Sequence, residues 1–330
     1  MKLFEHEALP SGHGSLVASS KLNHIAMGTF VTTDLARVRN FLENFNGMEC
    51  VVEADGRMLA RDRRAKYMME NAYRDFFVLE ITQVEAIIHP QGLFNHWGFV
   101  VGSEDEVRRL HQLCKDRAQE FGFKKINPIT PMHGSYGFYV IDVDDNWWEY
   151  EFRRGKTNSI FFSEGDFDEK GRENFTKHNL DIKISHIPSP ILEDDVYLTH
   201  GTTSVKDIKA SRAFYEDILQ LRYVCHTSMS SSLSGAGDVI VVAVQAGAKL
   251  QDQGQENRYV ILVDADSDVQ AFHERVVAAK EKYGLLLVEA IQPCDEGGIS
   301  FLLRTNDQIW FEVSSRPRSG IIELFSQKRV

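Results

Sequence analysis

The stretch DVDDNWWEYE, residues 142–151, places two glutamates two residues apart in a segment with the pattern of a strand. Alternate residues of a strand face the same side, so Glu149 and Glu151 share one face while Trp148 and Tyr150 share the other. A buried carboxylate costs free energy unless a cation or hydrogen-bond donors compensate it. The segment therefore indicates either a solvated polar face or a carboxylate that holds a metal ion.

Two histidines lie in earlier segments that also have the pattern of strands. His24 is in LNHIAM and His96 is in FNHWGF. Together with Glu149 they offer two imidazoles and one carboxylate, a set that can take one face of a divalent metal and leave the other positions open. Such a set is typical of non-haem Fe(II) oxygenases, and Mn, Zn and Ni also accept it. The alternative is that all three are ordinary residues at strand edges.

The elements that would position these residues recur four times along the chain. A strand, KLNHIAMGTFV, precedes an amphipathic helix over TTDLARVRNFLENF that stops near Gly47, and the extended segments GRMLARD, KYMMENA and DFFVLEITQ follow. The same order begins again at NHWGFVV, and then at YLTHGTTSV and RYVILVD in the second half. The sequence therefore predicts four βαβββ units in two pairs.

Length and composition bound the class of protein. The chain has 330 residues, 43% of them hydrophobic and 26% charged, which is typical of a globular protein of two domains. We expect an N-terminal extension over 1–20, a metal-binding domain over 21–154, a linker or lid over 155–195, and a second domain over 196–330.

The charge and the cysteines limit the partners. A net charge of −11 disfavours nucleic acid and anionic membranes. No apolar run approaches the roughly 18 residues of a membrane span, and the N-terminal residues lack the apolar core of a signal peptide, so a cytoplasmic location is predicted. The four cysteines, with no CxxC pair, predict neither disulfides nor a thiolate zinc site. The sequence leaves open whether the chain forms a homo-oligomer.

Taken together, these positions resemble the vicinal oxygen chelate superfamily, which contains glyoxalase I, methylmalonyl-CoA epimerase, fosfomycin-resistance proteins and type I extradiol ring-cleaving dioxygenases. The resemblance covers both halves and implies an α+β fold of two tandem open barrels with a metal inside. DVDDNWWEYE is similar to the family's D-P-x-G-N-x-x-E strand, with Val143 and Asp145 in place of proline and glycine. This register implies that Glu149 binds the metal, whereas Glu151 is solvated or paired with Arg153 or Arg154.

The second half is interpreted as a degenerate copy of the first. In this interpretation His200 matches His24, Glu312 matches Glu149, and Arg258 stands where His96 would be. A guanidinium cannot bind a cation, so a salt bridge between Arg258 and Glu312 is predicted in place of a metal.

The resemblance implies an Fe(II)-dependent extradiol-type dioxygenase that acts on a small catechol-like aromatic substrate with O2. His133 would be the acid/base and Tyr139 would orient the substrate, since the family places such residues before the metal glutamate. Inward-facing aromatic side chains would line the pocket, with Trp97, Tyr136 and Trp147 as the candidates.

Two alternatives stay open. Glu80 in VLEITQ resembles the extra glutamate of glyoxalase I, and as a fourth ligand it would imply a metal-dependent isomerase or lyase. Otherwise Glu80 is a carboxylate that hydrogen-bonds a ligand histidine. The second alternative is a non-catalytic protein that binds a small molecule, such as those that sequester bleomycin.

Overall fold

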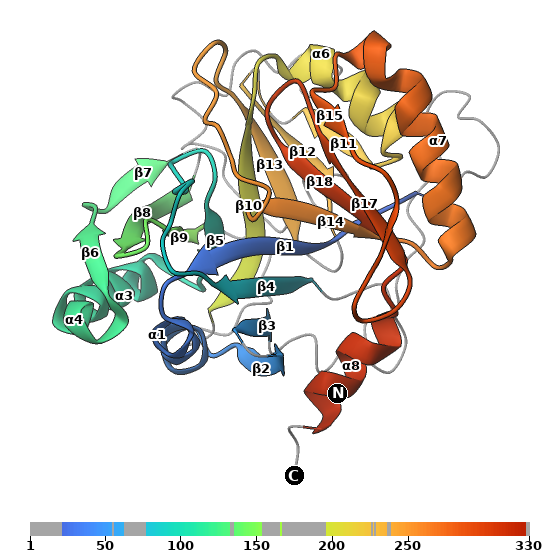
Figure 1. Ribbon diagram of the computed structural model, residues 1–330. Coiled ribbons are helices and arrows are strands. Elements are labelled where there is room, and N and C mark those ends of the chain that lie inside the picture. Colours follow the sequence, from blue (N-terminus) through green and yellow to red (C-terminus); the bar gives the residue numbers. More distant parts are fainter. Residues whose placement is uncertain are drawn as a thin grey trace, which may run out of the picture.

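The computed structural model describes residues 22–54, 56–62, 77–132, 135–153, 166, 196–225, 227, 229–235 and 239–327. The predicted α+β class with four βαβββ units is confirmed, and the units build two open mixed sheets (Figure 1). The predicted extension 1–20, the extended segment KYMMENA, His133, and the linker apart from Asp166 lie outside the described residues. Among the described helices, none has the length and apolarity needed to cross a membrane.

The first half of the chain forms units 1 and 2. Unit 1 contains β1 (Ile25–Thr32), α1 (Leu35–Asn40), the helical turn η1 (Phe41–Phe45), β2 (Glu49–Ala54), β3 (Arg57–Arg61) and β4 (Val78–Gln83). Unit 2 contains β5 (Trp97–Val100), α3 (Glu104–Asp116), α4 (Ala118–Phe121), β6 (Phe123–Ile126), β7 (Thr130–Met132), β8 (Ser135–Asp142) and β9 (Trp147–Phe152).

The second half forms units 3 and 4 and a terminal helix. Unit 3 contains β10 (Tyr197–Val205), α6 (Ile208–Ala213), the helical turn η4 (Phe214–Ile218), β11 (Tyr223–Cys225), β12 (Ser230–Ser234) and β13 (Ile240–Gln245). Unit 4 contains β14 (Arg258–Leu262), α7 (Asp266–Tyr283), β15 (Leu287–Val288), β16 (Gln292–Pro293), β17 (Ile299–Arg304) and β18 (Trp310–Ser314), and α8 (Arg318–Gln327) follows.

Each sheet combines one unit from each half of the chain. Units 1 and 4 form sheet I, in the order β15-β17-β18-β14-β1-β4-β3-β2, and units 2 and 3 form sheet II, in the order β11-β12-β13-β10-β5-β9-β8-β6. The units meet through antiparallel first strands, β1 with β14 and β10 with β5. The expectation that consecutive units pair is corrected here. The pattern of one unit specifies its own strands, but it does not specify which other strand the free edge of its first strand will meet.

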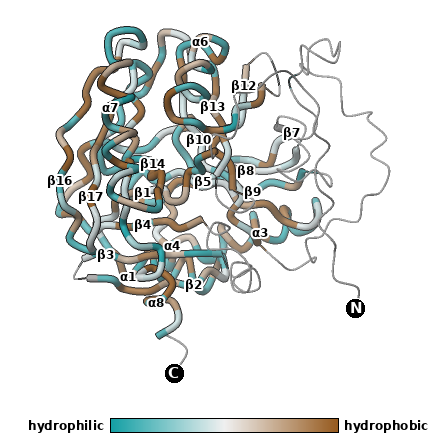
Figure 2. The backbone as a smooth tube through the Cα atoms, turned by 90° about the vertical axis from the view of Figure 1, so that its right-hand side faces the viewer, coloured by the Kyte–Doolittle hydropathy of each residue, from teal (hydrophilic) through white to brown (hydrophobic). Residues whose placement is uncertain are grey.

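Alternation along the strands separates a face that packs into the main core from the opposite face, which we call the inward face because it carries the candidate site. In β4, Leu79 and Ile81 are buried in the main core, whereas Glu80 between them points to the opposite face. The core lies between the sheets and the helices, and hydrophobic stretches run through the central strands in Figure 2. Aromatic rings fill much of it, as in the stacked pair Phe99 and Tyr150, whose centroids are 5.5 Å apart.

Candidate metal centre

One spacing places an inward-facing residue at the same point in every unit. The helix N-caps are Asp34, Ser103, Asp207 and Ala265. Seven residues before these caps lie, in the same order, Met27, His96, His200 and Arg258. A second position in each unit lies on its last strand, where it pairs with the residue two places after the first position. These second positions are Glu80, Glu149, Val242 and Glu312. Each unit thus contributes one side chain from its first strand and one from its last.

In sheet II these positions bring together His96, Glu149 and His200, which we call the His–Glu–His group. Their ligand atoms all lie within 4.8 Å of one another, and all three residues are buried. Oε2 of Glu149 is 3.1 Å from Nε2 of His96 and 2.8 Å from Nε2 of His200. Val242 occupies the fourth position, so the four inward positions of sheet II, all among the described residues, offer three ligands.

His24 does not join this group, contrary to the sequence-based expectation. It immediately precedes β1 of sheet I, ten residues before the N-cap Asp34, and is therefore not at the inward position. The residue of unit 1 that matches His200 is Met27. Matching the two histidines by their strands alone shifted the alignment by three residues, and the N-cap spacing would have corrected it.

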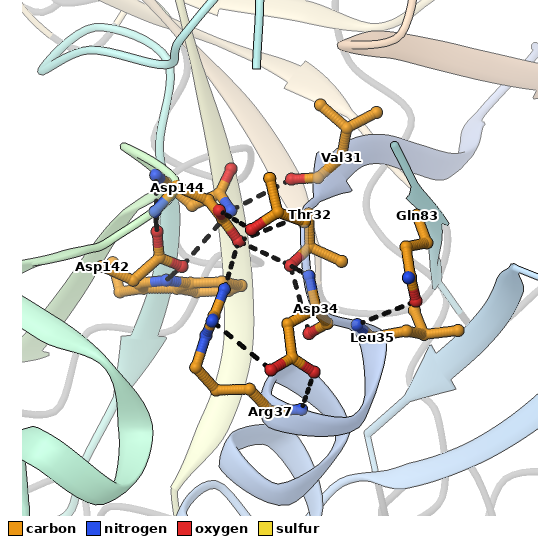
Figure 3. Close-up of polar contacts among 11 residues, drawn as sticks. Val31, Thr32, Asp34, Leu35, Arg37, Gln83, Asp142 and Asp144 are labelled. Atoms are coloured by element: carbon orange, nitrogen blue, oxygen red, sulfur yellow. Dashed lines mark hydrogen bonds and ion pairs between the residues drawn. The ribbon is translucent and has the colours of Figure 1, made fainter. Parts of the chain in front are cut away.

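Hydrogen bonds of Asp142 and Asp144 hold the turn between β8 and β9, which leads into the strand of Glu149; Figure 3 shows these two aspartates. Oδ1 of Asp142 accepts hydrogen bonds from the backbone N–H groups of Asp144 and Asn146, both at 2.9 Å. Asp145 has φ 64°, the left-handed conformation that the family's glycine would adopt and that aspartate tolerates. Burial raises the pKa of Asp142 to about 6, although hydrogen bonds from Asn146 and the Trp148 indole favour the charged form.

Asp144 connects this turn to the first unit through hydrogen bonds and an ion pair (Figure 3). Its carboxylate accepts hydrogen bonds from the Thr32 hydroxyl at 2.6 Å and the Thr33 hydroxyl at 2.5 Å, and Nη2 of Arg37 lies 2.6 Å away. Burial alone would raise the pKa of Asp144, but these donors and the charge of Arg37 lower it. The turn that positions Glu149 in sheet II is therefore anchored on β1 and α1, next to sheet I.

The hydrogen bonds of His96 favour a cation beside it. Nδ1 of His96 is 2.6 Å from the carbonyl oxygen of Leu93, so Nδ1 carries a proton and donates it. In the neutral ring Nε2 then has only a lone pair, which faces Oε2 of Glu149 and the Thr202 hydroxyl. Two acceptors in contact need a proton or a cation between them, and the second possibility fits metal ligation through Nε2.

His200 has the opposite arrangement. A guanidinium can only donate, so Nη2 of Arg153, 2.8 Å from Nδ1 of His200, donates to that nitrogen. The proton of the neutral ring is then on Nε2, which donates it to Glu149. Burial lowers the pKa of His200, and the charge of Arg153 lowers it further despite the hydrogen bond to Glu149. Metal ligation through this Nε2 requires the proton to leave and Arg153 to withdraw from Nδ1.

The net charge of the site also fits a cation. Glu151 is buried and forms an ion pair with Arg153, as one of the sequence-based alternatives predicted. The buried site contains two carboxylates, Glu149 and Glu151, and one guanidinium, Arg153, so the acidic groups outnumber the guanidinium by one. A divalent cation would compensate this excess, so the donor set and the charge agree.

The predicted substrate residues are divided between the two faces of sheet II. Tyr139 is on the site face, with its ring centroid 5.1 Å from that of His96. Burial, and the charge of Glu149 to which it hydrogen-bonds, raise the pKa of Tyr139, so its hydroxyl is protonated. Trp147 is half-buried beside it, with 6.0 Å between the ring centroids.

Trp97 and Tyr136 do not line the site. Trp97 points into the core, where its ring lies so close to Gly28 that a Cβ atom there would overlap it. Tyr136 packs toward the core beneath Arg108 of α3, whose guanidinium is 5.3 Å from the ring centroid. Both were expected in the pocket because they are aromatic and near the ligands, but alternation along β5 and β8 turns them away.

Glu80 belongs to sheet I and not to the His–Glu–His group. Its carboxylate accepts a hydrogen bond from Nη1 of Arg316 at 2.8 Å and lies 3.8 Å from Arg258. Neither sequence-based alternative for Glu80, a fourth ligand or a carboxylate that hydrogen-bonds a ligand histidine, agrees with these contacts, and Val242 occupies the fourth position. The predicted salt bridge between Arg258 and Glu312 is present, with Nε 2.6 Å from Oε2.

Solved structures resemble this fold over nearly the whole chain. Glyoxalase I from Zea mays matches with a TM-score of 0.60 at 14% identity, over 93% of this chain and 96% of that one. A candidate dioxygenase from Bacillus subtilis matches with a TM-score of 0.53 at 13% identity, over 91% and 87%. No protein-family model and no curated protein matches the sequence. The predicted resemblance to the vicinal oxygen chelate superfamily is confirmed at the level of the fold.

Proposed function

We propose that the protein is a metal-dependent dioxygenase of the extradiol type, whose ion is held by His96, Glu149 and His200. The observation that carries the proposal is the valine at the fourth inward position of sheet II. Three protein ligands leave the remaining positions of a metal free for two substrate oxygens and O2, as in 2-His-1-carboxylate oxygenases. Fe(II) is the proposed metal, and Mn(II), Zn or Ni would fit the same donors.

The surrounding side chains support a small aromatic substrate. A bound Fe(II) would supply a Lewis acid for two adjacent substrate oxygens and a site for O2. Tyr139 keeps its proton, so it can donate a hydrogen bond to a substrate oxygen beside His96. Trp147, half-buried beside Tyr139, offers an aromatic surface against which a catechol-like ring can pack. His133 stays the proposed acid/base on the strength of the sequence alone.

A metal-dependent isomerase or lyase is the second candidate, and one observation favours it. Glu151 provides a second buried carboxylate, 3.7 Å from Nδ1 of His200, that could accept a proton from a carbon acid. Its ion pair with Arg153 opposes this role, because the carboxylate is already engaged by the guanidinium. The hydrogen bond of Glu80 to Arg316 in sheet I argues against the form of this hypothesis in which Glu80 completes four ligands.

Oxygen uptake distinguishes the two candidates. The protein is loaded anaerobically with Fe(II), mixed with catechol in air-saturated buffer, and followed with an oxygen electrode, alongside an assay with a 2-oxoaldehyde–glutathione adduct. We expect catechol-dependent oxygen uptake that Glu149→Gln abolishes and His24→Ala preserves. Turnover of the adduct without oxygen uptake would instead establish the isomerase, and absence of both activities would leave a non-catalytic binding protein.

A further inference from the structure

Sheet I contains a cavity at the place that corresponds to the His–Glu–His group in sheet II. The cavity has a volume of about 210 Å³, and Met27, Glu80, Arg258 and Glu312 are among its lining residues. These are the four inward positions of units 1 and 4, defined by the same spacing and the same strand ladders. Figure 1 shows β4, β1, β14 and β18, which carry them, side by side. The two sheets therefore present two equivalent sites with different chemistry.

Arginines replace the metal ligands in this cavity. Arg258 takes the position of His96 and is paired with Glu312 at 2.6 Å, and Arg316 is paired with Glu80 at 2.8 Å. Arg57, which also lines the cavity, contacts Glu296. Guanidinium groups only donate hydrogen bonds and stay charged, so this cavity cannot hold a metal through the equivalent residues. It offers fixed positive and negative groups for an organic ligand.

The buried Arg316 contacts two carboxylates, Glu80 and Glu53, but one of its donors lacks hydrogen-bond geometry. Arg316 is 8% exposed, and its Nη2 has no hydrogen-bond partner of suitable geometry, although it forms an ion pair with Glu53. Burial lowers the pKa of Arg316 to about 10, which shows that its neighbours do not fully offset the loss of hydration. A ligand carboxylate, which matches the planar guanidinium with two hydrogen bonds, would complete this environment.

The other lining residues indicate which charge, apolar surface and size a ligand of this cavity needs. Asp295, which is exposed, and Glu296 lie on the loop between β16 and β17, on the solvent side of the cavity. Met27, Val260 and Leu262 form an apolar wall that packs against α8. Three arginines and four acidic residues line the cavity, so its net charge is negative and a simple anion is disfavoured. Ligand pockets usually measure about 300–1,000 Å³, so a small molecule fits best.

We infer that this cavity binds a free α-amino acid with an apolar side chain. The carboxylate meets Arg258 and Arg316, the ammonium group meets Asp295 and Glu296, and the side chain packs on Met27, Val260 and Leu262. A zwitterion satisfies both signs of charge and leaves the net charge of the cavity unchanged. This site requires no metal and does not depend on the proposed dioxygenase activity.

Isothermal titration calorimetry with L-leucine tests the inference directly. The full chain is titrated in the presence of EDTA, which removes any contribution from the metal centre, and 4-methylpentanoate and isopentylamine serve as analogues that lack one charge each. We expect saturable binding of leucine and at least tenfold weaker binding of both analogues. Arg258→Gln should weaken leucine binding at least tenfold, whereas Arg304→Gln, which removes a partly exposed arginine outside the cavity, should not.

Thermal unfolding of each variant checks that it is folded, and Glu296→Gln, near the solvent side, provides a second perturbation that removes one negative charge from the cavity. The inference is overturned if leucine does not bind the wild-type chain, or if 4-methylpentanoate binds as tightly as leucine. Leucine binding that Arg258→Gln and Glu296→Gln both leave unchanged would likewise overturn it, because the ligand would then lie elsewhere.

Discussion

Nε2 of His200, in the second half of the chain, donates a hydrogen bond across 2.8 Å to Oε2 of Glu149, in the first half. Because β10 pairs with β5, the candidate metal centre is shared between the halves and is complete only when units 2 and 3 form one sheet. The two halves therefore do not divide into a metal domain and a structural domain. Each half contributes one unit to each of the two sites.

Gly98 lies two residues after His96 and opposite His200 in the ladder between β5 and β10, and there is no room for a side chain at this position. A Cβ atom at this position would overlap the His200 imidazole. We expect Gly98→Ala to displace that ring and to reduce the metal content at least tenfold without removing any ligand, as measured by elemental analysis after dialysis. Gly320→Ala on α8 is the control, since nothing lies within 4 Å of its added methyl group. Normal metal content in Gly98→Ala would show that the ring is not held where the structure places it.

Arg153 opposes metal binding through its hydrogen bond to Nδ1 of His200. Gln has an acceptor oxygen in place of the guanidinium, and it would favour the tautomer of His200 with a free Nε2. We expect Arg153→Gln to tighten metal binding about tenfold, the lower end of the effect of partners of ligand histidines. Competition with a metal-sensitive chelating dye measures this. The same variant should lose roughly 3 kcal/mol of unfolding free energy, because Glu151 is left buried without its ion pair. Weaker metal binding would contradict the tautomer assignment.

A substitution of Glu80 distinguishes the three-ligand His–Glu–His site from the alternative in which Glu80 is a fourth ligand. We expect Glu80→Gln to leave metal content and oxygen uptake within twofold of the wild type, because the carboxylate lies in sheet I. It should nevertheless destabilise the fold by about 1–2 kcal/mol in urea unfolding, since the buried Arg316 loses one of its two carboxylate partners and keeps Glu53. Loss of the metal in a Glu80→Gln protein that remains folded would restore Glu80 to the ligand set.

Asp144 should make stability depend on acid pH. Its folded-state pKa is lowered, because the Thr32 and Thr33 hydrogen bonds and Arg37 outweigh burial. The unfolded carboxyl therefore takes up its proton at higher pH than the folded one. The stabilisation is full above the unfolded pKa of about 3.9 and is lost as the pH falls through the lower folded value.

Urea unfolding of wild type and Asp144→Asn at pH 7 and pH 3 measures this effect. At pH 7 we expect the variant to be less stable by about 1–3 kcal/mol, because Arg37 and the two threonine hydroxyls lose a charged acceptor. At pH 3, below the unfolded pKa of about 3.9, the difference should shrink because the wild-type carboxyl takes up a proton when the protein unfolds. An equal difference at both pH values would mean that Asp144 is not charged in the folded protein.

Local patterns predicted the elements and part of the site. Hydrophobic periodicity identified the four units, and the resemblance of Asp142 and Asn146 to the family's strand pattern implied the register of Glu149, because the turn these residues build has a sequence signature. The pairing of Arg258 with Glu312 followed from the repeat of the units. These features depend on residues close in sequence or on a comparison between repeats.

The strand that pairs with the free edge of each unit's first strand could not be predicted in the same way. Nothing in β1 or β10 specifies a partner strand, so consecutive units were paired by default and His24 was preferred to His200. One difference was present, since Thr202 and Ser204 continue a polar face after His200, whereas the same face of β1 after Met27 carries Thr29 and Val31. Arg153 and His200 are 47 residues apart in the sequence, and no local sequence pattern predicts their contact.

Metal stoichiometry after anaerobic purification tests the shared site most directly, with wild type, His200→Ala and His24→Ala measured in parallel by elemental analysis. The His–Glu–His group predicts about one metal ion per chain in the wild type and in His24→Ala, and at least a tenfold loss in His200→Ala. Loss of the metal in His24→Ala with retention in His200→Ala would place the ion within the first half alone and contradict a site shared between the halves.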